Sequence, residues 1–230
     1  MKSFFDRLRR ARMETEHART RTTFDAWALD GRDSKMETGH GPIARRVFES
    51  LHVAADARYL DIGCGNGYTV RWAAAAAPRG QAVGVDLSPQ MIRRARELSA
   101  GIPNVMFHEA AFPDHELPPA SFDAIFSMEV LYYFSDPVAA LREILGLLKP
   151  GGTFVSAIDL YRENRLSHGW INYVGASMKI WSGRRWRRAF ERAGFTAVAQ
   201  ERMVIPPKEA VESWHATVGC LVTSGRRPPG

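Results

Sequence analysis

The feature that most constrains the fold of this chain is a glycine-rich segment directly after a short apolar run. Residues 60–67 read Leu-Asp-Ile-Gly-Cys-Gly-Asn-Gly, and a helical pattern through Trp72 and a run of alanines follows. A short apolar run that ends at glycines predicts a buried strand. Glycine carries no Cβ, so the backbone of such a turn can approach a ligand closely. The segment therefore predicts a strand, loop and helix with a binding site at the turn.

Strand and helix patterns then alternate. We predict strands at 59–62, 82–85, 105–108, 122–127 and 153–158, and two more at 195–205 and 217–223. Ser88 before Pro89, and Asp136 before Pro137, each have the residue types of a helix N-cap followed by the first helical position. A further helix is expected between its N-cap Ser182 and Gly194, which ends it. This alternation predicts an α/β fold with a doubly wound, mostly parallel sheet and helices on both faces.

Two segments depart from the alternation. Residues 1–43 form an N-terminal arm, in which 1–21 has helical spacing of apolar side chains and 31–42 is punctuated by glycines before a helix at 43–51. The arm is interpreted as a lid or surface arm, with a membrane or partner anchor as the alternative. Residues 159–181 are rich in Tyr, Trp, Asn and Met without a clean period. We expect a domain at 44–230 that carries a substrate-side insert at 159–181.

Composition excludes several classes of protein. The chain has 230 residues, 45% of them hydrophobic, and two cysteines that form no metal-binding or disulfide framework. The longest apolar run, 72–78, is too short to cross a bilayer, and the N-terminus lacks the apolar core of a secretory signal. We therefore expect one large cytoplasmic domain without a metal.

The net charge of +6 leaves acidic partners open, but it is distributed unevenly. Residues 1–21 carry seven Lys or Arg against three Asp or Glu, and residues 179–192 carry six against one. Residues 101–141 hold six acids and no Lys or Arg. The basic charge thus lies on two amphipathic helices, which counts against nucleic acid as the partner without excluding it.

The glycine segment differs from known phosphate loops. Tyr68 occupies the position of the third glycine of a dinucleotide loop, and no Gly-Lys-Ser/Thr follows. Asp86 ends the second strand nineteen residues after Gly67. A carboxylate there can accept both hydroxyls of a ribose, although a turn residue before a capped helix is the alternative for Asp86 alone.

The pattern Asp61-x-Gly63-x-Gly65-x-Gly67, together with Asp86 and Leu-Leu-Lys-Pro-Gly-Gly at 147–152, resembles the class I S-adenosylmethionine-dependent methyltransferases. The resemblance runs from about Ala44 to Thr223. It implies a seven-stranded sheet with three helices on each face and the last strand antiparallel. It also implies S-adenosylmethionine as cofactor and methyl transfer by in-line displacement.

The resemblance implies a set of cofactor contacts. Glu109 is the candidate for the adenine amino group, although His-Glu-Ala-Ala-Phe at 108–112 departs from the Gly-Asp-Ala-like turn of the family. Arg32 is a candidate for the methionine carboxylate. The full cofactor set is Arg32, Asp61, Gly63, Cys64, Gly65, Gly67, Asp86, Leu87, Met91, Glu109, Ala110 and Met128.

A small-molecule acceptor is the preferred interpretation. Ser-Met-Glu at 127–129 stands where many base-methylating enzymes carry Asn/Asp-Pro-Pro-Tyr/Phe. The alternatives are an RNA or protein methyltransferase that uses the basic helix 184–192, and a non-catalytic cofactor-binding protein. The acceptor atom, the use of a general base and the oligomeric state stay open.

Aromatic and titratable residues near the predicted mouth supply the acceptor-side candidates. Each has a structural alternative: the histidines as buried structural groups, the aromatic side chains as core, and Glu129 as a cofactor or loop contact. Catalytic candidates are Tyr132, Tyr133 and His168, and substrate-binding candidates are Trp27, Met36, His40, Glu129, Tyr161, Trp170 and Tyr173.

Overall fold

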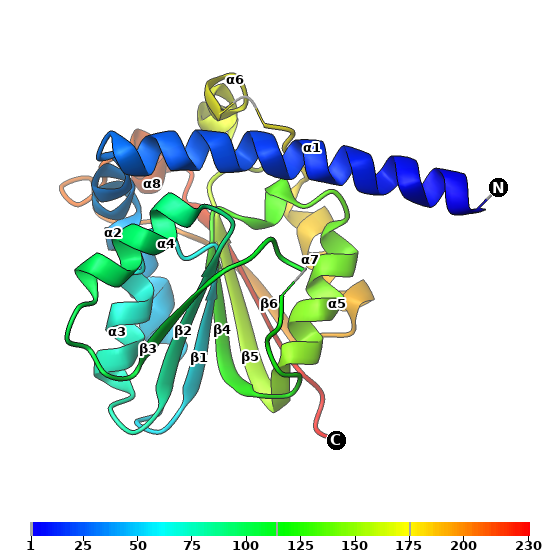
Figure 1. The fold of residues 1–230 in the computed structure, drawn as a ribbon. Helices are drawn as coiled ribbons and strands as arrows, with labels where there is room; N and C mark the ends of the chain where they lie inside the picture. The colour runs from blue at the N-terminus through cyan, green and yellow to red at the C-terminus, as the bar shows by residue number, and fades with distance from the viewer. Residues whose placement is uncertain (1, 114, 175) are drawn as a thin grey trace.

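The computed structural model describes residues 2–113, 115–174 and 176–230, with side chains from residue 14 onward. It contains one seven-stranded sheet of order β3-β2-β1-β4-β5-β7-β6 (Figure 1). The pairs among the first five strands are parallel, and β7 is antiparallel to both of its neighbours. The predicted seven-stranded sheet with an antiparallel last strand is confirmed. The strands are β1 (Arg58–Ile62), β2 (Gln81–Asp86), β3 (Val105–Glu109), β4 (Phe122–Met128), β5 (Leu148–Ile158), β6 (Thr196–Met203) and β7 (Cys220–Arg226).

Helices cover both faces of the sheet, as predicted, but in unequal number. One face packs against α2 (Arg32–Ser50), α3 (Tyr68–Ala76) and α4 (Pro89–Leu98), and the other against α5 (Pro137–Leu147) and α7 (Gly183–Ala193) (Figure 1). The expectation of three helices on each face is wrong for the second face. The described residues between β3 and β4 contain no helix, and Phe112 from this connection packs into the core there instead.

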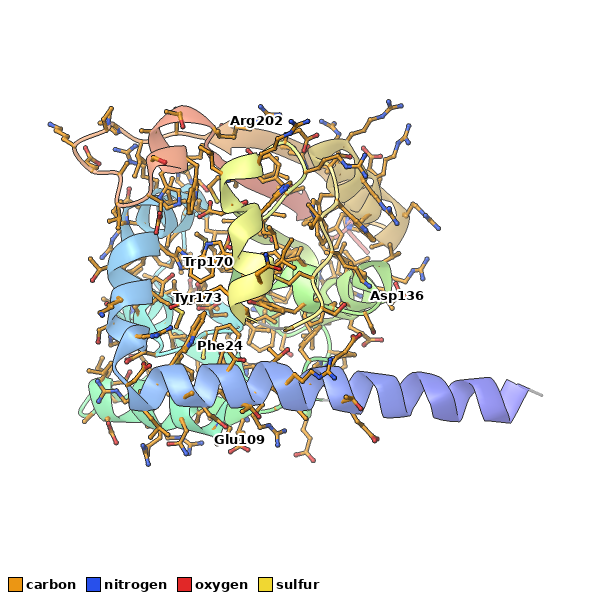
Figure 2. All side chains as sticks on the ribbon, turned by 90° about the horizontal axis from the view of Figure 1, so that it is seen from above. Phe24, Glu109, Asp136, Trp170, Tyr173 and Arg202 are labelled. Atoms are coloured by element: carbon orange, nitrogen blue, oxygen red, sulfur yellow. The ribbon has the colours of Figure 1, made fainter. Side chains whose placement is uncertain are left out.

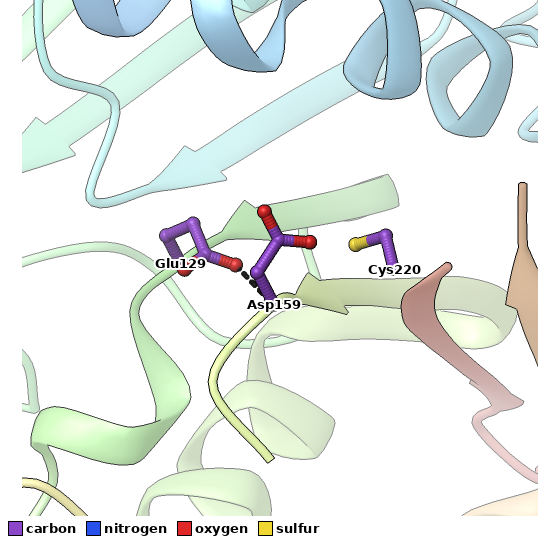
Figure 3. A group of neighbouring side chains, drawn as sticks. All are labelled: Glu129, Asp159 and Cys220. Atoms are coloured by element: carbon purple, nitrogen blue, oxygen red, sulfur yellow. Dashed lines mark hydrogen bonds between the residues drawn. The ribbon is translucent and has the colours of Figure 1, made fainter. Parts of the chain in front are cut away.

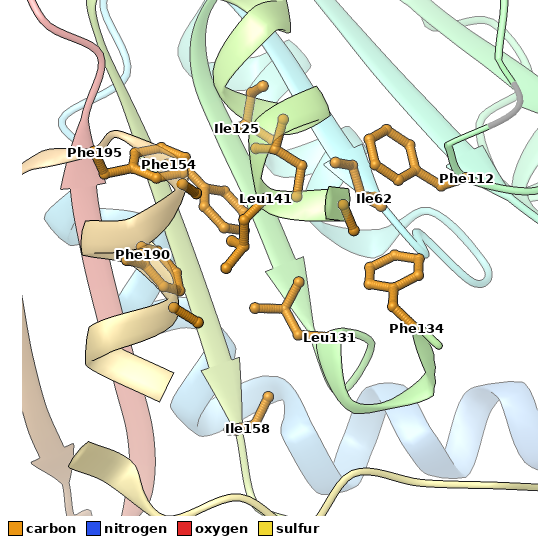
Figure 4. Packing of buried hydrophobic residues seen from close by; sticks show 14 of the residues in the cluster. Ile62, Phe112, Ile125, Leu131, Phe134, Leu141, Phe154, Ile158, Phe190 and Phe195 are labelled. Atoms are coloured by element: carbon orange, nitrogen blue, oxygen red, sulfur yellow. The ribbon is translucent and has the colours of Figure 1, made fainter. Parts of the chain in front are cut away.

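Aromatic stacking dominates the core between the sheet and the α5–α7 pair. Phe154 of β5 stacks on Phe190 of α7 with ring centroids 5.4 Å apart, and Phe195 packs against both (Figure 4). Trp186, one turn before Phe190, is 1% exposed. Because α7 buries these residues at helical spacing, its arginines are left on the opposite, solvent-facing side.

The N-terminal arm consists of two long helices, α1 (Lys2–Leu29) and α2, joined at Gly31. We expected a glycine-punctuated stretch at 31–42 and a helix only from residue 43. This expectation is wrong, because α2 runs through Gly39, Gly41 and Pro42. Burial of Asp33 at the start of α2 and of Ile43, Ala44, Val47 and Phe48 in its second half anchors both ends of the helix, and this outweighs the glycine and proline preferences between them. The amphipathic pattern of Phe4, Phe5, Leu8 and Ala11 lies outside the described side chains.

The insert after β5 is largely irregular, as expected. It contains two short helical segments, η2 (Arg165–Gly169) and α6 (Trp170–Val174), and α6 lies above α1 at the edge where β1, β2 and β4 end (Figure 1). A short helix, α8 (Ser213–Thr217), precedes β7, so the last strand begins at Cys220 rather than at residue 217. No helix in the described part of the chain is both long enough and apolar enough to cross a membrane.

Candidate active site

A cavity of about 780 Å³ opens at the carboxyl ends of β1, β2 and β4. Its floor is the glycine loop and the residues that follow β2 and β4, and its walls come from α1, α2, α6 and the short helix η1 (Leu131–Tyr133). Seen from above, Phe24 of α1 and Trp170 and Tyr173 of α6 lie close to one another where α1 and α6 approach (Figure 2). Carboxyl ends of parallel strands meet at one edge of a sheet, so the sequence-distant loops converge here.

The three glycines of the loop are required for different reasons. All have left-handed backbone conformations, with φ of +73° at Gly63, +52° at Gly65 and +79° at Gly67. A Cβ at residue 63 would lie 2.2 Å from Val130 Cγ2, and one at residue 67 would lie 2.8 Å from the Phe107 ring. A Cβ at residue 65 would meet nothing within 4 Å. Gly63 and Gly67 thus permit the packing of the loop, whereas Gly65 presents bare backbone to the cavity.

Asp86 connects the glycine loop to the turn before α4. Its Oδ2 accepts the Gly65 N–H at 2.9 Å and its Oδ1 accepts the Ser88 N–H at 2.8 Å. Burial raises the pKa of this carboxyl, and the two backbone bonds act in the opposite direction. Asp86 lines the cavity, and each of its oxygens can accept one bond more than the backbone bond described.

Asp61 is a buried carboxylate with one unpartnered oxygen. The Thr69 hydroxyl donates to its Oδ2, while Oδ1 has no hydrogen-bond partner among the described residues. Burial, and to a smaller extent the charge on Asp86, raises the pKa of Asp61 to about 7 despite the bond from Thr69. A cationic donor reaching this cavity wall would satisfy the free oxygen.

A polar network that sequence reasoning missed ties α2 to the loop. Asn66 Nδ2 donates to Glu37 Oε2 at 2.9 Å, and Arg71 Nη1 donates to the Asn66 carbonyl at 2.7 Å. Asp33, which is 1% exposed, accepts from Arg94 Nε at 3.5 Å. The spacing of Asp33 and Glu37 would have indicated one helix face, had 31–42 been recognised as helical.

The arm and the insert meet through aromatic side chains. Trp27 lies 6.0 Å from both Trp170 and Tyr173, measured between ring centroids, and Phe24 lies 5.9 Å from Tyr133. Arg32 places its guanidinium over the Trp27 and Tyr173 rings and donates to the Tyr173 hydroxyl at 2.5 Å. Three separate segments therefore build one aromatic wall of the cavity.

Most of the predicted site residues line this cavity. On the cofactor side they are Arg32, Asp61, Gly63, Cys64, Gly65, Asp86, Leu87, Met91, Ala110 and Met128, and on the acceptor side they are Trp27, Met36, His40, Glu129, Tyr132, Tyr133, Trp170 and Tyr173.

Four predicted residues do not line the cavity. The Glu109 side chain is exposed at the end of the edge strand β3, while residues 110–112 form the cavity wall in its place. Tyr161 is fully buried and donates to the Gly219 carbonyl at 2.9 Å. His168 Nε2 lies 3.1 Å from the Tyr161 carbonyl, so this side chain belongs to the insert rather than to the cavity wall. Gly67 packs beneath the loop, against Phe107.

Comparisons with known proteins agree with this geometry. Residues 60–156 match the family model described as a methyltransferase domain. A structure of a complex between the Haloferax volcanii Trm112 methyltransferase activator and a putative methyltransferase aligns with a TM-score of 0.81 and 33% identity. That alignment covers 89% of this chain and 97% of the other. The chain belongs to the class I S-adenosylmethionine-dependent methyltransferase family.

Curated relatives of this family member are longer proteins. A ubiquinone biosynthesis O-methyltransferase from Xanthomonas campestris is 37% identical over 137 residues, which cover 58% of this chain and 56% of that protein. A tRNA U34 carboxymethyltransferase from Citrifermentans bemidjiense is 27% identical over 168 residues, which cover 67% of this chain and 49% of that protein. The chain spans about half the length of the curated relatives it matches.

The family cofactor, S-adenosylmethionine, fits the residues that are present. The open space at Gly65, the free lone pairs of Asp86 and the unpartnered Asp61 oxygen supply bare backbone, a hydroxyl acceptor and an acceptor for a cation along one wall. These are the groups that the methionine and ribose portions of the cofactor require.

Binding of S-adenosylhomocysteine, the demethylated cofactor, should strengthen as the pH rises through about 7. Asp61 ionises over this range, and only its ionised form would attract the ammonium group of the ligand. Between about pH 6 and about pH 8 we expect the affinity measured by calorimetry to rise about tenfold. Asp61→Asn removes the titrating group and should flatten the dependence; an unchanged slope in this variant would assign the titration to another residue.

Proposed function

We propose that this chain transfers a methyl group from S-adenosylmethionine to a small-molecule acceptor with an aromatic or apolar body. The observation that carries the proposal is the continuity of one cavity. It joins the glycine loop and Asp86 to a chamber walled by Phe24, Trp27, Tyr133 and Trp170. The arm and the insert cover this chamber, which suits a ligand enclosed on several sides rather than a polymer lying in a groove.

The proposed reaction is an in-line displacement that depends mainly on alignment and exclusion of water. The cofactor supplies an electrophilic methyl group on its sulfonium. Asp61 and the backbone of 63–65 would hold the methionine portion, and Asp86 would hold the ribose. Aromatic side chains from α1 and α6 would orient the acceptor and keep water out.

The titration of purified protein with S-adenosylmethionine and with S-adenosylhomocysteine tests this proposal directly. We expect binding of both ligands, and transfer of a labelled methyl group to small phenols. A protein that binds neither ligand would contradict the proposed activity.

Trp170→Ala probes the acceptor chamber. Loss of its contacts with Trp27 and Tyr173 should raise KM for the acceptor about tenfold, equivalent to about 1.4 kcal/mol, without changing S-adenosylhomocysteine affinity more than twofold. Leu166→Ala is the matched control, because Leu166 belongs to the same insert but is 57% exposed and does not line the cavity. Equal effects of the two variants would argue against an acceptor site beside α6.

RNA methylation is the second candidate, supported by the similarity to a tRNA U34 carboxymethyltransferase. The arginines of α7 are not among the residues that line the cavity, and Arg185 instead stacks on Trp181 at 4.0 Å. This placement disfavours the basic helix as a guide for RNA into the site. Salt-dependent RNA binding that weakens in Arg184→Ala/Arg188→Ala would favour the second candidate.

A protein partner is a further candidate, because the similar Haloferax volcanii protein was solved in complex with the Trm112 methyltransferase activator. We propose that an activator of this kind binds this chain. Co-purification after co-expression, with a raised melting temperature for the complex, is the expected result. Separate elution of the two proteins would contradict it.

A further inference from the structure

Glu129 is held in an unusual position immediately after β4. Its φ is +60°, a left-handed conformation that is unfavourable for a residue with a Cβ and persists only when the surroundings enforce it. The Tyr132 hydroxyl donates to Oε2 at 2.8 Å, and the Asp159 backbone N–H donates to Oε1. Glu129 is half-buried and lines the cavity, so a side chain oriented by two hydrogen bonds lies at the cavity wall.

A second carboxylate stands beside it at the end of the neighbouring strand β5. Asp159 is 2% exposed, and its Oδ2 lies 2.6 Å from Nε2 of His215, which is fully buried. Figure 3 shows Glu129 and Asp159 adjacent, with Cys220 on the other side of Asp159. One potential donor atom from each of these three residues falls within 4.8 Å of the others.

The surroundings shift the pKa values of the two carboxyl groups in opposite directions. Burial opposes ionisation of Asp159, but the bond and the charge of His215 outweigh it and hold the pKa of Asp159 below its ordinary value. Burial, followed by the charge on Asp159, raises the pKa of Glu129 well above its ordinary value. Paired carboxyls whose pKa values are pushed apart commonly divide the roles of proton acceptor and fixed charge.

We infer that Glu129 accepts the proton of a hydroxyl acceptor during methyl transfer, and that Asp159, anchored by His215, is its positioning residue. This inference rests on the proposed function. The acceptor oxygen forms a bond to the methyl carbon as the carbon–sulfur bond breaks with its electron pair on sulfur. The O–H proton passes to the Glu129 carboxylate, and the products are a methyl ether, a neutral thioether and a protonated Glu129. A thiolate acceptor carries no such proton and needs no base.

Glu129, Asp159 and Cys220 suit proton exchange better than metal binding. Both Glu129 oxygens and Asp159 Oδ2 already take part in hydrogen bonds, which leaves Asp159 Oδ1 as the one carboxylate oxygen of the pair without a partner among the described residues. Burial raises the pKa of Cys220 well above its ordinary value, whereas the thiolate is the form that ligates metals. Activity is therefore expected to survive EDTA, and its loss, restored by a divalent metal, would overturn the inference.

The test compares two probe acceptors of similar shape, catechol and thiophenol, at a pH where thiophenol is ionised. Glu129→Gln should lower kcat for catechol about 10²–10⁴-fold and change kcat for thiophenol less than threefold. S-adenosylhomocysteine affinity and the melting temperature are measured on every variant to exclude misfolding. Glu143→Gln, at an exposed position on α5, is the matched charge-removal control and should affect neither acceptor.

Asp159→Asn tests positioning through the pH profile. Removing the charge on Asp159 lowers the pKa of Glu129, so the alkaline rise of kcat for catechol should move down by about one pH unit. The other titratable groups around Glu129 keep their side chains in this variant, while loss of the Asp159 charge also lowers the pKa of His40 and of Cys220. These groups are His40 of α2, Tyr68 of α3, Tyr132 and Tyr133 of η1, His215 of α8 and Cys220 of β7.

The outcomes separate the inference from the proposed function. Equal losses with both probes in Glu129→Gln, or a profile that Asp159→Asn does not shift, would overturn the inference while leaving methyl transfer intact. Wild-type protein that binds S-adenosylhomocysteine yet methylates neither probe would overturn the hydroxyl acceptor class. Failure to bind S-adenosylhomocysteine would instead contradict the proposed function.

Discussion

Replacing Asp86 by alanine is expected to weaken S-adenosylhomocysteine binding about 10²–10⁴-fold. Hydrogen bonds to a charged group contribute about 1.5–3 kcal/mol each, and a ribose offers two hydroxyls to this carboxylate. The loss of both, about 3–6 kcal/mol, corresponds to two to four decades in affinity. Isothermal titration calorimetry with S-adenosylhomocysteine measures the effect.

Asp86 also stabilises the glycine loop and the turn before α4, so the experiment needs a matched variant that separates this role from ligand binding. It accepts the N–H groups of Gly65 and Ser88, and alanine removes both anchors as well as the ligand contact. Asp86→Asn keeps the shape and one acceptor oxygen, so it should bind with intermediate affinity and melt between the wild type and Asp86→Ala, because its amide NH2 can accept neither backbone N–H. Affinity of Asp86→Ala within threefold of the wild type would refute the ribose role of this residue.

Gly65→Val is expected to abolish detectable cofactor binding while the protein remains folded. The side chain would enter open space, because no heavy atom lies within 4 Å of a Cβ at this position. It would occupy the cavity wall where the backbone must be approached closely. The left-handed conformation, with φ of +52°, adds about 1–2 kcal/mol of strain, less than the stability of an ordinary domain.

Gly67→Ala is the matched comparison for Gly65→Val. Its Cβ would lie 2.8 Å from the Phe107 ring and 3.1 Å from Ala95 Cβ, so the cost falls on folding rather than on ligand approach. Thermal denaturation should show the larger loss of stability for Gly67→Ala, and calorimetry the larger loss of affinity for Gly65→Val. Wild-type affinity in Gly65→Val would show that the ligand does not pass this part of the loop.

Local signals predicted much of the fold. Ser88 caps α4 by accepting the Met91 N–H, and Asp136 caps α5 by accepting the Ala139 N–H, as their positions before proline indicated. Gly194 ends α7 in a left-handed conformation. These features succeed because a cap or a stop depends on a few adjacent residues. The local signals of 31–42 predicted no helix, but Asp33 and Glu37 in this stretch bond to Arg94 and Asn66, and no local pattern shows those contacts.

The residues of the candidate site likewise fall into those that local sequence signals predicted and those that they did not. The glycine loop and Asp86 were predictable, because a strand end and a tight turn place them within one βαβ unit. Glu109 was assigned from a motif that this chain does not keep, and the alternation of β3 leaves its side chain exposed. Asp33 and Glu37 were missed because they belong to a helix whose sequence carries loop signals.

The sequence by itself determined the alternating α/β architecture, the mostly parallel sheet with its glycine loop, and the edge of the sheet at which the cavity opens. Periodicity, caps and turn residues are properties of neighbouring positions, and neighbouring positions are what a sequence displays. Only the tertiary structure decided that α1, α2 and the insert line one chamber, and that Glu129 at its wall bonds to Asp159, which in turn bonds to His215. These three residues are separated by 30 and 56 positions along the chain. Their contact arises from the adjacency of β4, β5 and β7 in the sheet, because strand order brings together side chains that no local pattern relates.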